Sequence, residues 1–354
     1  MKDAIFISIY LKISRILQKG ITIKMTNNTF ANMRTDLALE QSEILREGRP
    51  DDSSIDGVEI KTEEVNNIIV TWVKIVNEKG AEAMGKPIGN YITIESEAMK
   101  DNDIDAHEEI IKIMAQKLGQ LHKLNKNGSV LAAGLGNWQV TPDALGPKVI
   151  EKLLVTRHMN EILPEELQDR VRSMAAIAPG VMGNTGIETG EIIKGVAERI
   201  KPDLILAIDA LAARRTNRIN ATIQMTDTGI NPGAGLGNKR MRLNKETMGV
   251  PVIAIGVPTV VDAATLVNDT MNRMLTEMIR EASQGSPFYE MLVELEDDEK
   301  YGLIKDILDP YAGNMFVTPK EVDAVIDRLT NIIANGVNIA FHPGIDGGDI
   351  NRYL

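Results

Sequence analysis

The amino-acid sequence predicts an α/β protein with a mostly parallel central sheet, helices on both of its faces, and additional β-strands near the N-terminus. Apolar, β-branched segments alternate along the chain with segments whose apolar residues recur at helical spacing, which is the pattern of helix-covered parallel sheets. Hydrophobic residues make up 43% of the chain and aromatic residues only 4%. The core must therefore consist mainly of Ile, Val, Leu, Ala and Met, as is usual in such sheets.

The N-terminal region is largely polar. Residues 1–56 are irregular in pattern, and we expect them to form a leader or arm that offers no core face. The apolar run within residues 1–24 is interrupted by basic residues and has no signal-peptide cleavage site, so we expect neither export nor a membrane span. This run is either a short amphipathic helix or, as we favour, sequence that precedes a true translation start at Met25.

Three strands and a helix are expected next. Apolar residues at helical spacing predict a helix that begins at His107 and is stopped by Asn127 and Gly128. Alternation and β-branching predict the strands that precede it, over residues 57–65, 66–75 and 89–96.

Strand and helix segments then alternate through the middle of the chain. The strand over residues 129–136 is followed by a helix over 146–159, with Pro147 in its first turn. Further segments repeat this order: an apolar segment and glycine-rich loop at 174–183, a helix at 190–200, a strand at 203–211, a strand at 250–266 and a helix at 266–279.

The C-terminal part is predicted to end in another helix. The acidic run at residues 294–299 is interpreted as a solvated loop or helix face. After it, Thr318 has the position of an N-cap, Pro319 that of N1, Glu321 completes a capping box, and Gly336 is the expected stop. We find no internal repeat and no long linker, so residues 57–354 are expected to form one domain.

Charge and composition exclude several classes of site. The formal net charge of -11 argues against direct nucleic-acid binding, which depends on Lys and Arg neutralising phosphates. The absence of Cys excludes disulfides, zinc ribbons and thiol nucleophiles. The histidines, His107, His122, His158 and His342, have no metal-ligand spacing, so we expect no metal and no cofactor.

Three aspartates follow apolar strands, where catalytic groups gather in open parallel sheets. They are Asp143, Asp209 and Asp262, and for each one alone an N-cap or turn is the simpler interpretation. Asp262 precedes a helical segment as an N-cap would, and we favour that role for it. Asp143 lies in a glycine-bounded loop ahead of a helix, where backbone amides can orient it and the helix dipole favours its ionised form.

Asp209 requires a purpose or a partner, because an unpaired charge at the mouth of an apolar strand is costly. Arg214, Arg215 and Arg218 could pair with it or could bind an acidic substrate. Two carboxylates in different environments can also divide acid and base work, one taking a proton from water while the other donates one, and Asp143 is the candidate second carboxylate. The chain contains no G-x-S-x-G, H-E-x-x-H or Walker lysine motif.

Two glycine clusters are candidates for nucleotide-binding loops. The cluster at residues 134–137 follows a strand, but Gln139 stands where the third glycine of G-x-G-x-x-G should be. The cluster at 233–237 leads into a basic segment instead of a helix. Both are therefore expected to form tight loops that let the backbone approach a peptide or a carboxylate.

Several long motifs resemble those of one family. They are LAAGLGNWQVTPDALGPKV, APGVMGNTGIETGEI, AIDALAARRTNRINATIQMTDTGINPGAGLGN and GVPTVVDAATL. Together they are similar to the germination proteases of spore-forming bacteria, over roughly residues 30–354. The resemblance implies an atypical aspartic endopeptidase, related in fold to hydrogenase maturation proteases, with Asp143 and Asp209 as its catalytic pair. It also implies a homotetramer in the spore core that degrades small acid-soluble spore proteins.

The resemblance further implies a zymogen that removes its own N-terminal segment at a site like those in its substrates. Thr35-Asp36-Leu37-Ala38-Leu39-Glu40 fits such a site, so we predict cleavage between Asp36 and Leu37, a leader of residues 1–36 and an arm of 37–56. The alternative interpretation is an ordinary helix start capped by Thr35 or Asp36.

An acidic residue before the cut bond suggests a basic receiver. The candidates are Arg214, Arg215, Arg218 and Arg240, with structural pairing favoured for at least two of them. Two other functions stay open: a metal-dependent peptidase like the hydrogenase maturation proteases, and a non-catalytic module that binds spore proteins.

Overall fold

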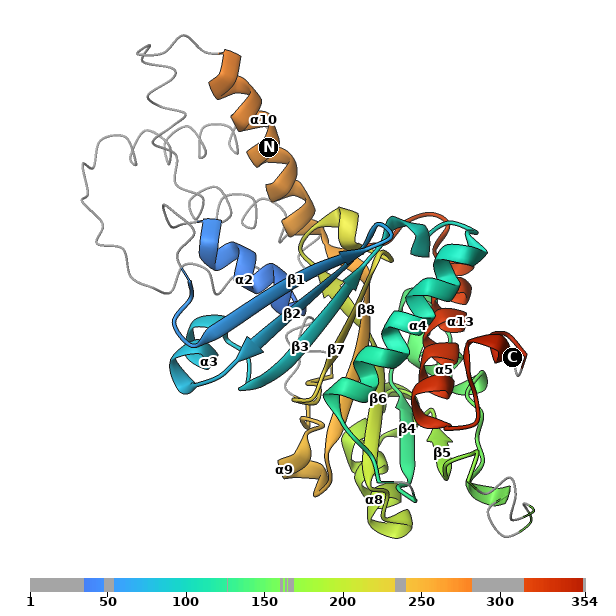
Figure 1. Cartoon of the computed structure of the whole chain (residues 1–354). Helices are drawn as coiled ribbons and strands as arrows, with labels where there is room; N and C mark the ends of the chain where they lie inside the picture. Colours follow the sequence, from blue (N-terminus) through green and yellow to red (C-terminus); the bar gives the residue numbers. More distant parts are fainter. Residues whose placement is uncertain are drawn as a thin grey trace. The chain divides into compact units, whose positions relative to one another are not determined.

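A mixed sheet of nine strands organises the described part of the protein, shown as a computed structural model in Figure 1. The chain divides into two units, Met1–Asn32 and Met33–Leu354. All residues described here lie in the second unit: 35–47, 54–125, 127–159, 162, 164, 169–232, 240–281 and 315–352. The predictions made for residues 1–24, for the acidic run at 294–299 and for the glycine cluster at 233–237 lie outside these residues.

The sheet has an antiparallel half and a parallel half. The strand order is β1-β2-β3-β7-β8-β6-β4-β5, with β9 pairing β8. Neighbours from β1 to β8 in this order are antiparallel, and those from β8 to β5 are parallel. The strands are β1 Val58–Val65, β2 Ile68–Ile75, β3 Gly89–Glu95, β4 Val130–Gly134, β5 Met174–Ile177, β6 Leu204–Ala213, β7 Thr222–Thr226, β8 Val252–Asp262 and β9 Phe316–Val317.

The prediction of a mostly parallel sheet is therefore wrong. The three N-terminal strands were expected, but β7 was not, and β7 runs antiparallel between β3 and β8. It joins the N-terminal strands to the parallel half, so that all of them form one sheet. Asn66 and Asn67 form the two-residue turn between β1 and β2 with positive φ angles of 51° and 62°, which this turn type requires.

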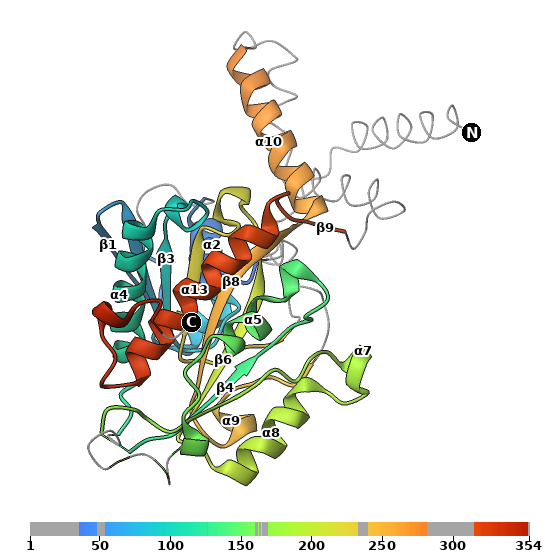
Figure 2. The same ribbon diagram turned by 90° about the vertical axis from the view of Figure 1, so that its right-hand side faces the viewer.

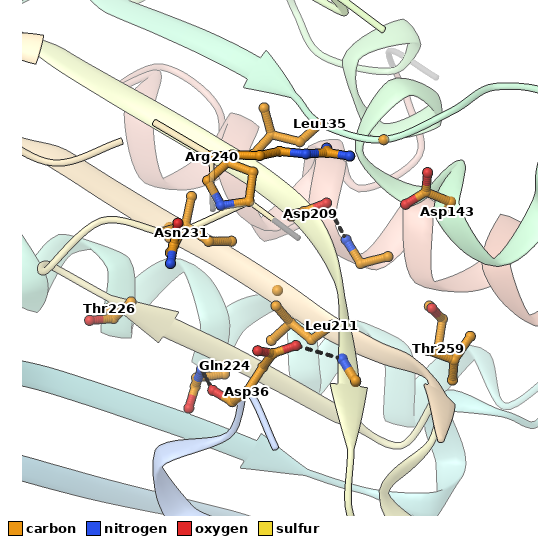
Figure 3. Close-up of a pocket in the computed structure, with 18 of the residues that line it drawn as sticks. Asp36, Leu135, Asp143, Asp209, Leu211, Gln224, Thr226, Asn231, Arg240 and Thr259 are labelled. Atoms are coloured by element: carbon orange, nitrogen blue, oxygen red, sulfur yellow. Dashed lines mark hydrogen bonds between the residues drawn. The ribbon is translucent and has the colours of Figure 1, made fainter. Parts of the chain in front are cut away.

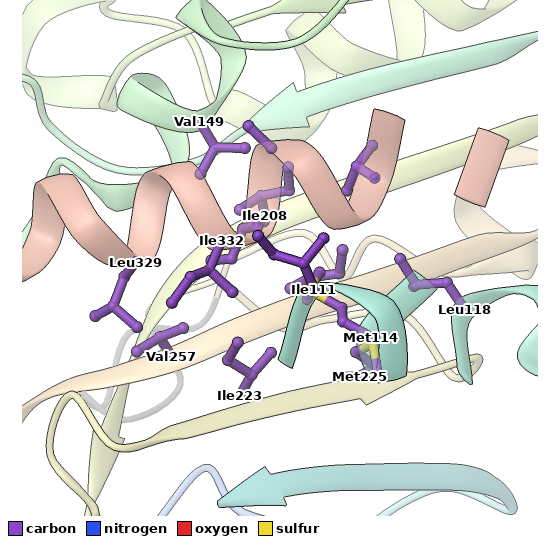
Figure 4. Close-up of a cluster of buried hydrophobic side chains, with 14 of the residues drawn as sticks. Ile111, Met114, Leu118, Val149, Ile208, Ile223, Met225, Val257, Leu329 and Ile332 are labelled. Carbon is purple, nitrogen blue, oxygen red and sulfur yellow. The ribbon is translucent and has the colours of Figure 1, made fainter. Parts of the chain in front are cut away.

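Helices flank the sheet on both faces, as predicted. Helix α13 lies between α4 and α5 on one face (Figure 2), where their apolar side chains form the main core with the strands (Figure 4). Helices α8 and α9 pack on the other face of the parallel half, and α2 and α3 pack on the antiparallel half. The helices are α2 Ala38–Glu47, α3 Glu78–Met84, α4 Ile104–Leu121, α5 Leu145–Glu151, α7 Met182–Thr185, α8 Thr189–Ile200, α9 Lys245–Met248, α10 Ala263–Glu281 and α13 Val322–Phe341.

Helix α13 differs from its prediction at both ends. It begins at Val322 with Glu321 in the N-cap position and no side-chain cap, so Thr318 does not cap it and no capping box forms; the Thr318 hydroxyl donates to the carbonyl of Thr259, 2.9 Å away. Gly336 does not stop it but lies in its interior, where an added Cβ would come within 2.9 Å of Met114 on α4. The glycine allows α4 and α13 to pack closely. Its role is therefore in tertiary packing and not in ending the helix.

Helix α2 corrects the expectation that residues 37–56 offer no core face. Ala38 and Ile44 are buried, and the preceding Leu37 is fully buried between β6, β8 and the turn after β6. The helix begins at Ala38, and the hydroxyl of Thr35 accepts a hydrogen bond from the Leu37 amide at 3.1 Å. A helix start was the alternative interpretation of this segment.

Two further helices differ from prediction only in their bounds. Asp103 caps α4 by accepting from the Ala106 amide, so this helix begins earlier than His107 and ends at Leu121. Helix α5 ends at Glu151, well before the predicted end at residue 159. Within the described residues, no helix has the length and apolarity needed to cross a membrane.

Candidate active site

One pocket of about 620 Å³ opens on the sheet face opposite α4, α5 and α13. Alternation along β6 shows which face it is. Leu206 and Ile208 point into the core beneath α13, whereas Ile205 and Ala207 point to the opposite face, and Asp209 continues that second row. Asp209 therefore places a carboxylate in the floor of the pocket, in line with the apolar side chains of Ile205 and Ala207.

Asp209 lies within β6 and not at its end, which corrects the strand boundary inferred from the sequence. The neighbouring strand β4 ends at Gly134, whose register partner is Ile208. On the other side β6 continues to pair with β8 as far as Ala213, with a register shift between Leu211 and Ala212. Asp209 thus stands just beyond the carboxyl end of β4, where the sheet loses one neighbour and leaves space for a ligand.

Asp143 enters the pocket from the loop between β4 and α5. It ends the short 3-10 turn Thr141–Asp143, and the Asn137 amide donates to its carboxylate at 2.9 Å. Gly136 has a φ of 111°, and an added Cβ would lie 2.0 Å from the Asp143 carbonyl oxygen. The first glycine cluster is therefore a tight loop that approaches a carboxylate, as predicted.

The pKa values of both carboxyl groups are raised, and the charge of Asp143 contributes to the shift of Asp209. Burial raises the pKa of Asp209 well above its ordinary value, and the nearby charge of Asp143 raises it further. Burial also raises the pKa of Asp143, although its hydrogen bond from Asn137 and the charge of Arg240 act in the opposite direction. Figure 3 shows Asp143, Asp209 and Arg240 around the same pocket. Both shifts favour the protonated carboxyl more than in an exposed aspartate, and the stronger shift is that of Asp209.

Asp36 lines the same pocket and lies against β6 beyond the end of β4 (Figure 3). Its amide donates to the Ala212 carbonyl at 3.1 Å, and the Ala212 amide donates back to its carboxylate at 2.9 Å. The negative charge of Asp36 contributes to the raised pKa of Asp209. The chain at Asp36 thus forms part of the pocket wall and is bonded to β6.

Of the four arginines proposed as receivers, the pocket is lined by Arg240 alone among the described residues. The guanidinium of Arg218 is buried and bonds Glu43 on α2 and Glu95 on β3, at distances of 2.6 to 2.7 Å. The backbone amides of Arg214 and Arg215 donate to the Glu40 carboxylate at 2.7 and 2.9 Å.

Asp262, the third strand-end acid, caps α10 as expected. Its carboxylate accepts from the amide of Thr265 at 3.0 Å and from its hydroxyl at 3.1 Å. The described ranges contain no group of three or more His, Asp or Glu side chains placed to hold a metal ion.

Lys86, Gln224 and Arg242 are among the polar pocket residues that sequence reasoning missed. Gln224 lies on β7, where the alternation of Ile223 and Met225 with polar neighbours was the available signal of a strand. Lys86 follows the C-terminal glycine of α3, and no local pattern distinguishes it from a surface lysine. Arg242 belongs to the basic segment that was interpreted only as evidence against a nucleotide loop.

Comparisons with known proteins agree on one family. The family model described as germination protease matches residues 35–293 and 281–354. The chain is 53% identical over 323 residues to the germination protease of Clostridium tetani, covering 91% of this chain and 99% of that protein. It is 48% identical over 322 residues to the germination protease of Caldanaerobacter subterraneus, covering 91% and 98%. It is 43% identical over 356 residues to that of Bacillus thuringiensis, covering 91% and 97%.

Proposed function

The chain belongs to the germination protease family and is therefore an endopeptidase of spore germination, and we propose that Asp143 and Asp209 perform its chemistry as an acid–base pair. The observation that carries this proposal is that both carboxyl groups line one pocket with raised pKa values. Asp36, the residue before the expected cut, lines that pocket too. Peptide hydrolysis needs one group to take a proton and another to donate one.

The environments suggest a division of labour between the two carboxyls. Asp209 is only 7% exposed and has the more strongly raised pKa, so in this proposal it holds the proton. Asp143 is less buried, accepts the Asn137 amide and is the ionised base. Asp143 takes a proton from a water whose oxygen attacks the peptide carbonyl carbon. Asp209 gives its proton to the leaving nitrogen, and the carbon–nitrogen bond breaks to release a carboxylic acid and an amine, leaving Asp143 protonated and Asp209 ionised.

The same proposal includes self-processing between Asp36 and Leu37. It is supported by the position of Asp36 in the pocket that contains the acid–base pair. N-terminal sequencing of the processed protein tests it, and a new terminus at any residue other than Leu37 contradicts it. Replacing Asp143 should abolish this processing in the full chain.

The proposal also includes four features that the family resemblance suggests: the substrate, the basic residue that binds the acidic side chain, the oligomeric state and the location in the cell. The substrates are small acid-soluble spore proteins cut after an acidic residue, and the enzyme is a homotetramer in the spore core. Of the proposed basic receivers, Arg240 has support from its place in the pocket, while Arg214, Arg215 and Arg218 lie beside carboxylates of α2. Light scattering measures the assembly, and replacing each arginine by Ala should raise KM mainly for substrates with an acidic residue before the cut.

The decisive experiment compares Asp143→Asn and Asp209→Asn in separate full-length proteins. Each should lower kcat about 100- to 10,000-fold, because each removes one partner of the proton transfer. Asp203→Asn is the matched control: Asp203 precedes β6 on the exposed surface, binds Ser129 and does not line the pocket. It should retain near wild-type activity. Near-normal cleavage by either pocket variant contradicts the acid–base pair.

Exhaustive chelation separates this mechanism from the metal-dependent alternative. We expect cleavage to survive chelation, with no metal found by elemental analysis of the active protein. Loss of activity that a specific metal restores would favour a site like that of the hydrogenase maturation proteases. A processed protein that binds spore proteins without cleaving them would instead favour the non-catalytic module.

A further inference from the structure

The edge of β6 beyond β4 is a binding edge for main chain. Ile208, Ala210 and Ala212 present their backbone groups toward the β4 side, because alternate residues of a strand share a side. The Ile208 carbonyl accepts the Leu135 amide at 2.8 Å, and β4 pairing ends there. The Ala210 amide donates to the side chain of Asp209 at 2.9 Å. The Ala212 amide donates to the carboxylate of Asp36, and the Ala212 carbonyl accepts from the Asp36 amide.

Two side chains hold the carbonyl of Asp36, the group that precedes the expected cut. The ammonium of Lys86 donates to this carbonyl oxygen at 2.9 Å, and the side-chain amide of Gln224 donates to it at 3.2 Å. The oxygen of the same Gln224 amide accepts from the Ala38 backbone at 2.6 Å. Gln224 therefore binds main-chain atoms on both sides of Leu37, and these contacts do not depend on the side chains of the segment.

Lys86 alone of these two groups also acts on the Asp36 side chain by charge. Burial raises the pKa of the Asp36 carboxyl, and the positive charge of Lys86 lowers it. Burial lowers the pKa of Lys86, and the negative charge of Asp36 raises it. The backbone of Lys86 is held in the turn that ends α3, where its amide donates to the Ala81 carbonyl at 3.2 Å, and its ammonium is held by the Asp36 carbonyl. A cation bound at the main chain of Asp36, near its carboxylate, can discriminate charged from neutral side chains at this position.

We propose that Lys86 is the specificity-determining residue that selects an acidic side chain before the cut bond, while Gln224 binds the peptide main chain without regard to side chains. This inference rests on the proposed function, since it assigns a role in cleavage between Asp36 and Leu37. The substrate class it defines is an extended peptide with Asp or Glu before the scissile bond. The peptide adds to the free edge of β6 as a short strand, as in other β-augmentation sites.

The test is a double-mutant cycle on self-processing of the full chain. Four chains are compared: wild type, Asp36→Asn, Lys86→Met and the double variant. Asp36→Asn should slow cutting at least tenfold in the wild-type background, because the charge attracted by Lys86 is removed. In the Lys86→Met background the same change should slow cutting by no more than about twofold, since no cation is left to distinguish the two side chains.

Gln224→Met is the matched control in the same pocket. It should slow cutting by the same factor whether it is introduced into the wild-type chain or into the Asp36→Asn chain, because Gln224 contacts only main-chain atoms of this segment. Circular dichroism and thermal unfolding confirm that each variant is folded. If Lys86→Met does not fold, Lys86→Gln, which keeps a polar side chain at this position, is measured in its place.

The outcomes are distinguishable from failure of the proposed function. A wild-type chain that is never cut, in dilute solution or at high concentration, contradicts the proposed function itself. A wild-type chain that is cut, with effects of Asp36→Asn and Lys86→Met that simply multiply, overturns only the role of Lys86. The role of Lys86 is supported if Asp36→Asn slows cutting at least about fivefold more in the wild-type chain than in the Lys86→Met chain. In the Gln224→Met chain, Asp36→Asn should have the same effect as in the wild-type chain.

Discussion

The two faces of strand β6 differ in what they do, although their residues alternate along one segment. On one face Leu204, Leu206 and Ile208 are fully buried beneath α13 and form part of a closed apolar core. On the other face the row of Ile205 and Ala207 leads to a carboxylate and an open pocket. One strand thus supplies stability through one face while its other face carries costly polar groups. The closed face should therefore govern unfolding, and the open face should govern cleavage.

The largest expected effect on stability lies on the closed face. Ile332 of α13 is 1% exposed within this core (Figure 4), and Ile332→Ala should lower the free energy of unfolding by about 3 kcal/mol through lost burial and a residual cavity. Urea unfolding measures this loss. The matched control is Ile104→Ala at the first turn of α4, where the side chain is 62% exposed and the change should stay within about 0.5 kcal/mol. The specific activity of folded Ile332→Ala should be close to that of the wild type. A large loss of activity would contradict the statement that the closed face governs unfolding and the open face governs cleavage.

A smaller effect on stability, joined to a loss of activity, is expected at the rim of the open face. Gly136→Ala places a Cβ against the Asp143 carbonyl at a positive φ that favours glycine, and we expect a loss of about 2 kcal/mol. Cleavage should fall as well, because Asp143 must shift. Gly249→Ala also has a positive φ, 77° at the end of α9, but meets no atom within 4 Å, so it should lose about 1 kcal/mol and keep its activity. Equal activities of the two variants would contradict the role given to the Gly136 loop.

The smallest effect is a pH dependence of stability that the open face produces. The pKa of Asp209 is raised in the folded protein, so between the ordinary Asp range and that raised pKa the folded state binds more protons than the unfolded state. Stability should therefore fall as pH rises through this window, by at most about 1.4 kcal/mol per pH unit for one proton.

Asp209→Asn removes that proton, so the variant should become more stable relative to wild type as pH rises. Urea titrations of both proteins at about pH 5 and about pH 7, both above the ordinary range of an Asp carboxyl, measure the difference. A constant difference at the two pH values would mean that the carboxyl is not held at a raised pKa. The same substitution is expected to abolish cleavage, which would show stability and activity changing in opposite directions at one residue.

Much of the architecture was predictable because it depends on local patterns. The strands β1, β2 and β3 have the alternation and β-branching that a half-buried sheet requires, and the Asn66-Asn67 turn fits a tight hairpin. Asp262 precedes a helical segment and does cap α10. Strand β7 was missed because its five residues, all buried, are too few to show a period clearly. The error about a parallel sheet follows from that single strand.

The site was predictable only in part. Asp143 and Asp209 could be nominated because catalytic groups gather at the carboxyl ends of strands and because the motifs around them resemble one family, and they do line one pocket. Lys86 could not be nominated, since it reaches Asp36 across 50 residues of sequence. Gln224 lies 188 residues from Asp36 and was equally invisible to any local pattern.

The alternation of strands and helices, the apolar composition of the core and the two candidate carboxylates follow from the amino-acid sequence, because each depends on residue type and short-range spacing. The mixed sheet, the packing role of Gly336 and the place of Asp36 in the pocket appear only in the folded protein. Those outcomes depend on which distant surfaces meet, and burial raises the pKa of Asp209 only once β6, β8 and the Gly136 loop surround it. The charges that make the pocket reactive are thus encoded locally, but their chemistry arises from long-range packing.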